Sequence, residues 1–387
     1  MRQGRRGYHP FSTGSTGRAH SLKSILRRVV AEPGHAMVHL DWLGREEASR
    51  IAGSPPQGKL RKIPELSTDE GHSANMIING DNLPAMTALT PTLRGLVDLA
   101  FLDPPYNATR ERWTYPDRIL GWFGSVVGAE GEDPLRHGKW LSMMYPRLAL
   151  LRVLLAESGA LFITLDDHEA HHARVLMDEI FGPENFLANI TWEKTQTPED
   201  TSAPFLETHT HVIAYAKNAK TWRPNHAVGK VPTVWSAAET GSTSKARVVT
   251  PSRPGALYPL VPKPVGLLRR ILRIADPDAL VLDPFAGSGT TAHAILEQNI
   301  SDGGHRSFVL IETEDRARTL ITRRLAQVTS GPPDYGFYIV APNHDERCLA
   351  VSPSPGAHSP WPAFGDGGNH REGPAGTGCP APPLALP

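Results

Sequence analysis

Cysteine is nearly absent from this chain of 387 residues, which contains 2 cysteines. Both of them, Cys348 and Cys379, lie in a C-terminal stretch that is rich in proline and glycine. This scarcity excludes a disulfide framework and a zinc site built from cysteines, and it fits a reducing compartment. The chain also lacks an apolar run long enough to span a membrane, and its basic start has no apolar signal core. We therefore expect a protein of the cytoplasm.

An excess of charge of either sign is absent as well. The 40 basic and 40 acidic residues give a formal net charge of +0. This balance neither supports nor excludes binding to nucleic acid, because a local basic face can exist within a neutral total. Glycine (35) and proline (36) are abundant and point to loop-rich ends. We predict a partly disordered N-terminal arm over 1–70, a folded domain over 71–342 and a disordered tail over 343–387.

One apolar stretch, Leu96 to Leu102, predicts a buried strand that ends abruptly at Asp103-Pro104-Pro105-Tyr106. Two prolines cannot continue a central strand, so the chain must leave the sheet there. In open α/β sheets this carboxyl edge is where ligands bind. A flat group that bears an amine suits the motif, since Asp103 and the Pro104 carbonyl can accept two N–H bonds while Tyr106 stacks on its face. The alternative is a plain Asx-Pro turn that closes the strand.

A second apolar strand, over 279–283, is followed by the sequence Pro-Phe-Ala-Gly-Ser-Gly, residues 284–289, which we call the glycine loop. Its glycines permit a tight turn, and the helix expected over 293–298 offers free N–H groups at its start. The spacing also fits a dinucleotide fingerprint, with Glu312 as the ribose ligand at the end of the next strand. Taken alone, the loop is compatible with a nicotinamide-dependent oxidoreductase.

Other apolar patterns predict the surrounding elements. We expect a helix over 139–155 that Gly159 ends, a strand over 159–166, an antiparallel strand pair at one sheet edge over 187–192 and 209–217, a helix over 265–274 and a strand over 307–312. The strands that alternate with helices predict a mostly parallel sheet.

The Asp-Pro-Pro-Tyr motif and the glycine loop together strongly resemble the S-adenosylmethionine-dependent amino-methyltransferases that act on DNA. The catalytic motif of that family is Asp-Pro-Pro-Tyr and its cofactor loop is Phe-x-Gly-x-Gly, and both occur here. The motif precedes the loop, which is the permuted order of the beta class. The resemblance covers about residues 39–340 and implies an α/β, Rossmann-like methyltransferase fold with a doubly wound sheet and circularly permuted motifs. Residues 39–52 are also similar to the modification (methylase) subunits of type III restriction systems.

The resemblance assigns roles to individual residues. It implies catalytic residues at Asp103, Pro104, Pro105 and Tyr106. It implies S-adenosylmethionine ligands at Asp81, Lys263, Asp283, Phe285, Gly287, Gly289, Thr290 and Glu312. It implies DNA contacts at Asn107, Arg110, Arg112 and Trp113. Three alternatives stand beside these roles: Asp81 as a helix N-cap, Lys263 as the partner of a surface acid, and the segment after Tyr106 as a plain surface loop.

The chain departs from the type III subunits in one respect. Those subunits usually carry a long target-recognition insertion after the strand expected at 209–217, whereas here a loop follows it. The folded domain at 71–342 is then a methyltransferase domain in which 193–257 form a reduced recognition region. A double-stranded DNA partner, a homodimer and a restriction nuclease subunit follow from the resemblance.

The sequence His168-Glu-Ala-His-His172 satisfies the His-Glu-x-x-His pattern of zinc proteases. Such a site needs a third ligand and lies within a helix that borders a cleft. Here the pattern directly follows a strand, with Asp166 or Asp167 placed to cap the next helix. We therefore expect no metal.

The predicted reaction is methyl transfer from S-adenosylmethionine to the exocyclic N6 amine of an adenine in DNA, as part of a restriction-modification system. Hydrogen bonds from the amine to Asp103 and the Pro104 carbonyl would draw the nitrogen toward tetrahedral geometry for an in-line displacement. The target atom is unreachable inside a duplex, so base flipping is expected. Cytosine-N4 transfer is the first alternative, although those enzymes usually carry Ser in place of Asp103. An RNA or protein amino-methyltransferase, an oxidoreductase and a non-catalytic DNA-binding remnant are the others.

Overall fold

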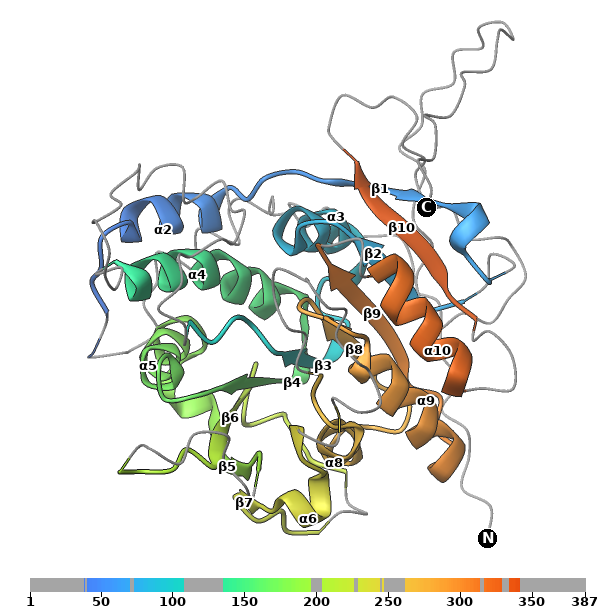
Figure 1. Ribbon diagram of the computed structural model, residues 1–387. Helices are drawn as coiled ribbons and strands as arrows, with labels where there is room; N and C mark the ends of the chain where they lie inside the picture. The colour runs from blue at the N-terminus through green and yellow to red at the C-terminus, as the bar shows by residue number, and fades with distance from the viewer. Residues whose placement is uncertain are drawn as a thin grey trace, which may run out of the picture.

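The computed structural model describes residues 38, 40–69, 73–107, 135–195, 204–225, 229–243, 246, 262–313, 317–328 and 334–341. Figure 1 shows the arrangement of the elements within these ranges. Three of the expected DNA-contacting residues, Arg110, Arg112 and Trp113, lie outside them, as does the C-terminal tail. In the part of the chain that is described, no helix is both long and apolar enough to cross a membrane.

The described strands form one ten-stranded sheet with the order β1-β10-β2-β9-β8-β3-β4-β6-β5-β7. Their bounds are β1 Lys59–Lys62, β2 Met76–Asn79, β3 Val97–Leu102, β4 Leu155–Leu165, β5 Phe186–Glu193, β6 His209–Ala216, β7 Val234–Trp235, β8 Leu280–Asp283, β9 Ser307–Glu312 and β10 Gly336–Ala341. The strands from β10 to β4 in this order run parallel, whereas β1 and β6 join them antiparallel. The inner strands are apolar on both faces, as parallel strands covered by helices require.

Helices cover both faces of this sheet. They are α2 Arg45–Gly53, α3 Asn82–Leu93, α4 Arg136–Leu154, α5 Ala170–Phe181, α6 Ala237–Thr240, α8 Val265–Ile274, α9 Thr290–Asp302 and α10 Thr322–Val328, with short turns η1 Pro64–Leu66, η3 Pro183–Asn185 and η5 Ala317–Ile321. Helices α2 to α5 share one apolar core with the sheet, and α8, α9 and α10 share the other. The Rossmann-like α/β fold expected from the sequence is thereby confirmed.

The sheet reverses its winding between β3 and β8. These two strands are parallel neighbours, with Leu99 opposite Val281 and Ala100 opposite Leu282. After β3 the chain passes through α4 on one face to β4, and after β8 it passes through α9 on the other face to β9 (Figure 1). Loops that leave adjacent strands in opposite directions open a crevice at the carboxyl ends. The Asp-Pro-Pro-Tyr motif follows β3 and the glycine loop follows β8, so both motifs border this crevice.

Gly159 does not end a helix, and this expectation was wrong. Helix α4 ends at Leu154, and β4 begins at the next residue and includes Gly159. A Cβ atom on Gly159 would lie 2.6 Å from the carbonyl oxygen of Val97 in β3. The glycine is required because the two backbones approach closely, not because a helix stops.

The strand pair β5–β6 is antiparallel as expected, but the region after it is more than a loop. Strand β7 pairs with β5 in parallel, and Trp235 within it is fully buried. At the opposite edge of the sheet, β1 pairs with β10. The described part of the expected N-terminal arm therefore contributes to the same sheet, while the domain boundaries themselves remain predictions.

Candidate active site

Asp103 follows the last residue of β3 and is held at both carboxylate oxygens. Its Oδ1 accepts a hydrogen bond from the Thr164 hydroxyl at 2.7 Å, and its Oδ2 accepts one from Lys263 Nζ at 2.7 Å. Thr164 is in reach because β4 pairs with β3. A carboxylate oxygen can accept two hydrogen bonds, and the Asp103 side chain is 23% exposed. The carboxylate is therefore oriented, and it retains acceptor positions for a ligand.

Lys263 reaches this carboxylate from the segment just before α8. Its Nζ also lies 4.8 Å from the centre of the Tyr106 ring. Burial by itself would lower the pKa of the Lys263 ammonium, but Asp103 and Tyr106 beside it raise that pKa above its ordinary value. A charged ammonium therefore lies within the motif. The acid that Lys263 pairs with is Asp103, and its predicted contact with the cofactor remains a prediction.

The rest of the motif is fixed by its surroundings. Pro104 is buried, and the Pro105 carbonyl accepts a hydrogen bond from Trp140 Nε1 at 2.7 Å. The ring of Tyr106 is partly buried, and burial, followed by the charge of Asp103, raises the pKa of its hydroxyl. The Tyr106 hydroxyl forms no hydrogen bond with any described residue. The nearby Thr164 side chain nevertheless opposes the rise in the pKa of Tyr106. Lys263 Nζ lies over the Tyr106 ring, and the stacking role of Tyr106 remains a prediction.

The glycine loop is organised by Asp283, the last residue of β8. Its Oδ1 accepts the backbone N–H of Phe285 at 3.0 Å and its Oδ2 accepts the Thr291 hydroxyl. Burial raises the pKa of Asp283 to about 7, and the charges of Asp103 and Glu312 add to this rise. The side chain is 2% exposed, so the structure shows Asp283 holding the loop. Its direct contact with a cofactor remains a prediction.

Two glycines of this loop have left-handed backbone angles, with φ of 52° at Gly287 and 77° at Gly289. A Cβ atom on Gly289 would lie 2.9 Å from Ile321 Cγ2. Thr290, the first residue of α9, is almost fully buried and its hydroxyl lies 3.3 Å from that of Ser288. Only glycine suits these loop positions, and the start of α9 is turned toward the crevice.

Glu312 and Asp81 close the other side of the crevice. Glu312 Oε2 accepts the Gly287 N–H at 2.7 Å and Oε1 accepts the Thr313 N–H at 3.0 Å. Asp81 accepts the Leu83 N–H at 2.9 Å and therefore caps α3. The N-cap alternative for Asp81 is thus confirmed, and its side chain is still 37% exposed. Carboxylates at this edge of the sheet suit the hydroxyl or amine groups of a cofactor.

Two side chains that sequence reasoning missed join these loops. Arg147 is fully buried in α4 and donates to Asn82 Oδ1 at 2.5 Å and to Asp81 Oδ1 at 3.1 Å. Asn82 Nδ2 in turn donates to the Pro284 carbonyl at 2.8 Å. An arginine inside an otherwise apolar helix is the signal that could have revealed this contact, because buried charges need partners.

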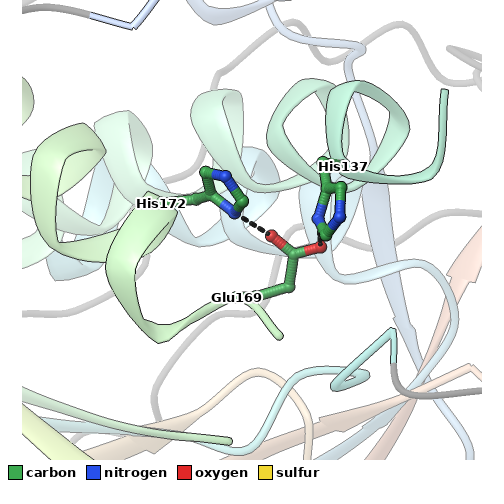
Figure 2. A group of neighbouring side chains, drawn as sticks. All are labelled: His137, Glu169 and His172. Atoms are coloured by element: carbon green, nitrogen blue, oxygen red, sulfur yellow. Dashed lines mark hydrogen bonds and ion pairs between the residues drawn. The ribbon is translucent and has the colours of Figure 1, made fainter. Parts of the chain in front are cut away.

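The zinc-protease pattern does not assemble as that pattern requires. His168 pairs with Asp166 at 3.1 Å, apart from His172. Glu169 and His172 instead meet His137, which comes from α4 (Figure 2). Asn107, one of the expected DNA-contacting residues, donates to Glu169 as well. The roles expected for the residues outside the described ranges stay predictions.

A family model described as DNA methylase matches residues 97–323, which is more than half of the chain. The chain belongs to the DNA methylase family. The matched residues include the Asp-Pro-Pro-Tyr motif, Lys263, the glycine loop and Glu312, whereas Asp81 precedes them.

Individual relatives agree with this membership. The StyLTI Mod subunit of a type III restriction-modification enzyme from Salmonella typhimurium is 26% identical over 382 residues, which cover 70% of this chain and 57% of that protein. The EcoPI Mod subunit of Escherichia phage P1 is 24% identical and covers 76% of this chain and 66% of its own length. The type II methyltransferase M.KpnI of Klebsiella pneumoniae is 23% identical, covering 66% of this chain and 84% of that protein. The chain spans from 57% to 66% of the length of the two Mod subunits.

Proposed function

We propose that this protein transfers a methyl group from S-adenosylmethionine to the exocyclic amine of a base in DNA, with the N6 amine of adenine as the target. The observation that carries the proposal is the meeting of the Asp-Pro-Pro-Tyr motif with the glycine loop at the crevice between β3 and β8. Membership of the DNA methylase family supports it. Asp103 favours adenine over cytosine, in keeping with the resemblance from which the residue roles were drawn.

The residues of the crevice fit the cofactor. The glycine loop has left-handed positions that a side chain would block, and two partly exposed acids, Glu312 and Asp81, lie beside it. Glu312 would hold the ribose hydroxyls, and Asp81 would lie toward the adenine end. When bound, S-adenosylmethionine supplies an electrophilic methyl group on a sulfonium.

The chain's own residues prepare the nucleophile. Asp103, oriented by Thr164 and Lys263, accepts one N–H of the target amine, and the Pro104 carbonyl accepts the other. These bonds draw the nitrogen toward tetrahedral geometry and so take its lone pair out of conjugation with the ring, while Tyr106 stacks on the face of the extruded base. Most of the rate gain would come from orientation and from placed charges, because no nucleophilic side chain is needed.

The partners are part of the proposal. The names of the relatives describe restriction-modification enzymes, and from them we infer a double-stranded DNA substrate and a role in such a system. A nuclease subunit and a homodimer are further proposals. Recognition of a DNA sequence would involve the region around β7 and α6, where the described basic residues include Lys220, Arg223 and Lys230.

The test is transfer of labelled methyl from S-adenosylmethionine to unmethylated duplex DNA, followed by nucleoside analysis. Wild type is compared with Asp103→Ala and with Asp278→Ala, which removes an exposed aspartate away from the crevice. N6-methyladenine made by wild type and Asp278→Ala, but not by Asp103→Ala, would establish the reaction. N4-methylcytosine would keep the mechanism and change the base. A wild-type protein that binds the cofactor and methylates no DNA would refute the proposal.

A further inference from the structure

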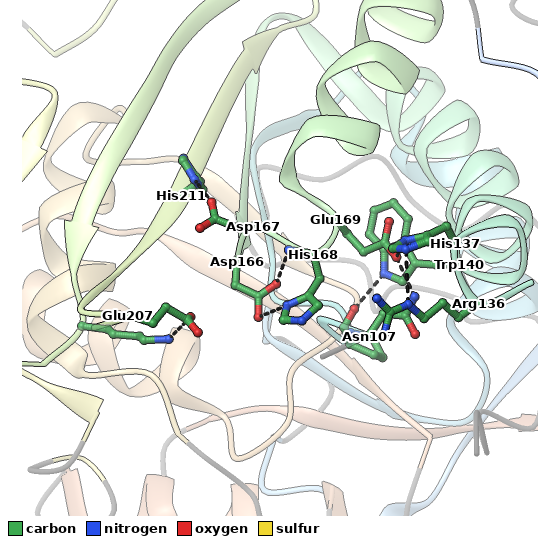
Figure 3. A network of polar contacts seen from close by, with 12 residues as sticks. Asn107, Arg136, His137, Trp140, Asp166, Asp167, His168, Glu169, Glu207 and His211 are labelled. Carbon is green, nitrogen blue, oxygen red and sulfur yellow. Dashed lines mark hydrogen bonds and ion pairs between the residues drawn. The ribbon is translucent and has the colours of Figure 1, made fainter. Parts of the chain in front are cut away.

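A fully buried carboxylate, that of Glu169, lies directly behind the Asp-Pro-Pro-Tyr motif. It accepts three N–H donors from three segments: Asn107 Nδ2 at 2.6 Å, His137 Nδ1 at 2.8 Å and His172 Nδ1 at 3.0 Å. Figure 2 shows the two imidazoles directed at it, and Figure 3 adds Asn107. Glu169 precedes α5 but does not cap that helix with its side chain. Its carboxylate therefore links separate segments of the chain rather than capping the helix that follows it.

Asn107 is the residue that this carboxylate holds at the end of the motif. It directly follows Tyr106 and has a φ of 58°, the one positive φ among the non-glycine residues that the structure describes. A residue with a side chain adopts this left-handed conformation only where its surroundings fix it, although Asn tolerates it better than most. The hydrogen bond to Glu169 is such a fixing contact.

Helix α4 connects the same carboxylate to the motif a second time. His137 in its first turn donates to Glu169, and Trp140, one turn later, donates to the Pro105 carbonyl at 2.7 Å (Figure 3). The backbone of the motif is thus held on both sides of Tyr106, at Pro105 and at Asn107. Glu169, which precedes α5, accepts the hydrogen bonds from Asn107 and His137, whereas the Trp140 bond reaches the motif directly.

The cluster has the residue types of a metal site, and its three ligand atoms lie within 4.8 Å of one another. The hydrogen bonds favour a different arrangement. Arg136 Nε donates to His137 Nε2 at 3.2 Å, which leaves Nδ1 as the donor to Glu169. A metal ion would have to displace the Nδ1 proton and take the place of these hydrogen bonds. His172 carries positive charge more readily than a free histidine, because its hydrogen bond to Glu169 raises its pKa.

We propose that Glu169 is a positioning residue for methyl transfer. Its carboxylate holds Asn107 in the left-handed conformation and thereby sets the direction in which the chain leaves Tyr106 and the orientation of the motif toward the glycine loop. The inference rests on the proposed function. Displacement of a reacting group by about 1 Å can lower a rate about a hundredfold, so a distant carboxylate can act in this way without touching substrate.

The first test compares Glu169→Gln with Asp178→Asn. Asp178 lies in α5, the helix that follows Glu169, and accepts hydrogen bonds from Tyr215 and Arg174, away from the motif. We expect Glu169→Gln to lower kcat by at least about tenfold, since a misplaced group loses rate, with the Kd for S-adenosylmethionine unchanged within a factor of about two. Asp178→Asn should keep the wild-type kcat. A Glu169→Gln protein with wild-type kcat would overturn the proposal.

A double variant separates positioning from general loss of stability. Asn107→Gly removes the same hydrogen bond while tolerating the positive φ. If Glu169 acts through Asn107, the double variant Glu169→Gln/Asn107→Gly should be no slower than the slower single variant. Rate losses that multiply would show that Glu169 acts by another route and would refute the proposal.

Two further readouts keep the outcomes apart. In protein labelled with ¹⁵N-asparagine, the Asn107 side-chain amide should exchange slowly with solvent in wild type and rapidly in Glu169→Gln, which can be read without any methyl transfer. A wild type that methylates no DNA refutes the proposed function, whereas a Glu169→Gln protein with wild-type kcat refutes the role of Glu169 alone. Treatment with a chelator should leave wild-type activity unchanged. Loss that zinc restores in wild type but not in His172→Ala would overturn the proposal in favour of a metal site.

Discussion

Lys263 Nζ lies 2.7 Å from Asp103 Oδ2, although the two residues are 160 positions apart in the sequence. The lysine side chain is 10% exposed, so this is a largely buried ion pair at the centre of the crevice. Such pairs stabilise a protein only weakly, but removal of one partner leaves a costly unpaired charge. We therefore infer that the role of Lys263 is to orient the Asp103 carboxylate.

Replacement of Lys263 by Met tests this relationship. We expect methyl transfer to fall by about 10- to 100-fold, because the loss of a hydrogen bond to a charged group of about 1.5–3 kcal/mol lets the carboxylate turn. Single-turnover kinetics measures the effect. Arg269→Met on the adjoining helix α8 is the control, since Arg269 pairs with Glu297 of α9 near the surface. A Lys263→Met protein as fast as wild type would show that Thr164 alone orients Asp103.

Glu312→Gln probes the expected ribose site. The carboxylate accepts the N–H groups of Gly287 and Thr313 and the Thr313 hydroxyl, so it is held at the end of β9, where the resemblance predicts contact with the ribose hydroxyls. The amide keeps the size but loses an acceptor, so we expect the Kd for S-adenosylmethionine to rise by about tenfold, equivalent to about 1.4 kcal/mol. Isothermal titration calorimetry gives the Kd. Glu297→Gln on α9 is the matched control, and equal Kd values for the two variants would rule out the ribose role.

Gly289→Ala and Gly303→Ala separate backbone strain from a steric clash. Both glycines have a left-handed φ, of 77° and 69°, but a Cβ atom at Gly289 meets Ile321 at 2.9 Å, whereas nothing lies within 4 Å at Gly303. Strain alone costs about 1 kcal/mol, and overpacking adds about 1–3 kcal/mol. We expect the free energy of unfolding in urea to fall more in Gly289→Ala. Equal losses would mean that α10 and the preceding turn give way to the methyl group.

The sequence predicted those parts of the site that depend on contiguous residues. The Asp-Pro-Pro-Tyr motif and the glycine loop each follow a strand, and the resemblance to the DNA amino-methyltransferases predicted that they form one site. The pairing of β3 with β8 makes the two motifs neighbours. The helix α8 was predicted with the bounds that it has, because its apolar residues repeat with helical spacing.

Contacts between distant segments were beyond such rules. Lys263 was expected near the cofactor, but the acid that it pairs with depends on how α8 packs beside β3. Glu169 belongs to the His-Glu-x-x-His pattern, but its partner His137 lies in α4. Nothing in the sequence around His137 indicates that it contacts Glu169. Gly159 was assigned to a helix end because glycine is common there, whereas the close approach of Val97 explains it. Side-chain partners are set by tertiary packing, which periodicity does not encode.

The buried carboxyl of Asp283 should make stability depend on pH. Burial raises its pKa from 3.8 to about 7. Between these two values the unfolded chain has lost the proton and the folded chain still holds it, so the contribution of this group to stability falls as the pH rises, and the loss is complete above about pH 7. Asp283→Asn does not titrate. We therefore expect the free energy of unfolding of the variant to rise relative to that of wild type, by up to about 1.4 kcal/mol per pH unit from pH 5 to 7.

Urea unfolding of both proteins at pH 5, 6, 7 and 8 measures this difference. Asp278→Asn, at an exposed position, is the control and should show the same pH dependence as wild type. The amide of Asp283→Asn still accepts one of the two donors, Phe285 N–H or the Thr291 hydroxyl, so the loop should keep its shape. A difference between Asp283→Asn and wild type that stays constant with pH would show that Asp283 is ionised in the folded protein throughout this range. The hydrogen bonds from the loop, rather than burial, would then control its charge.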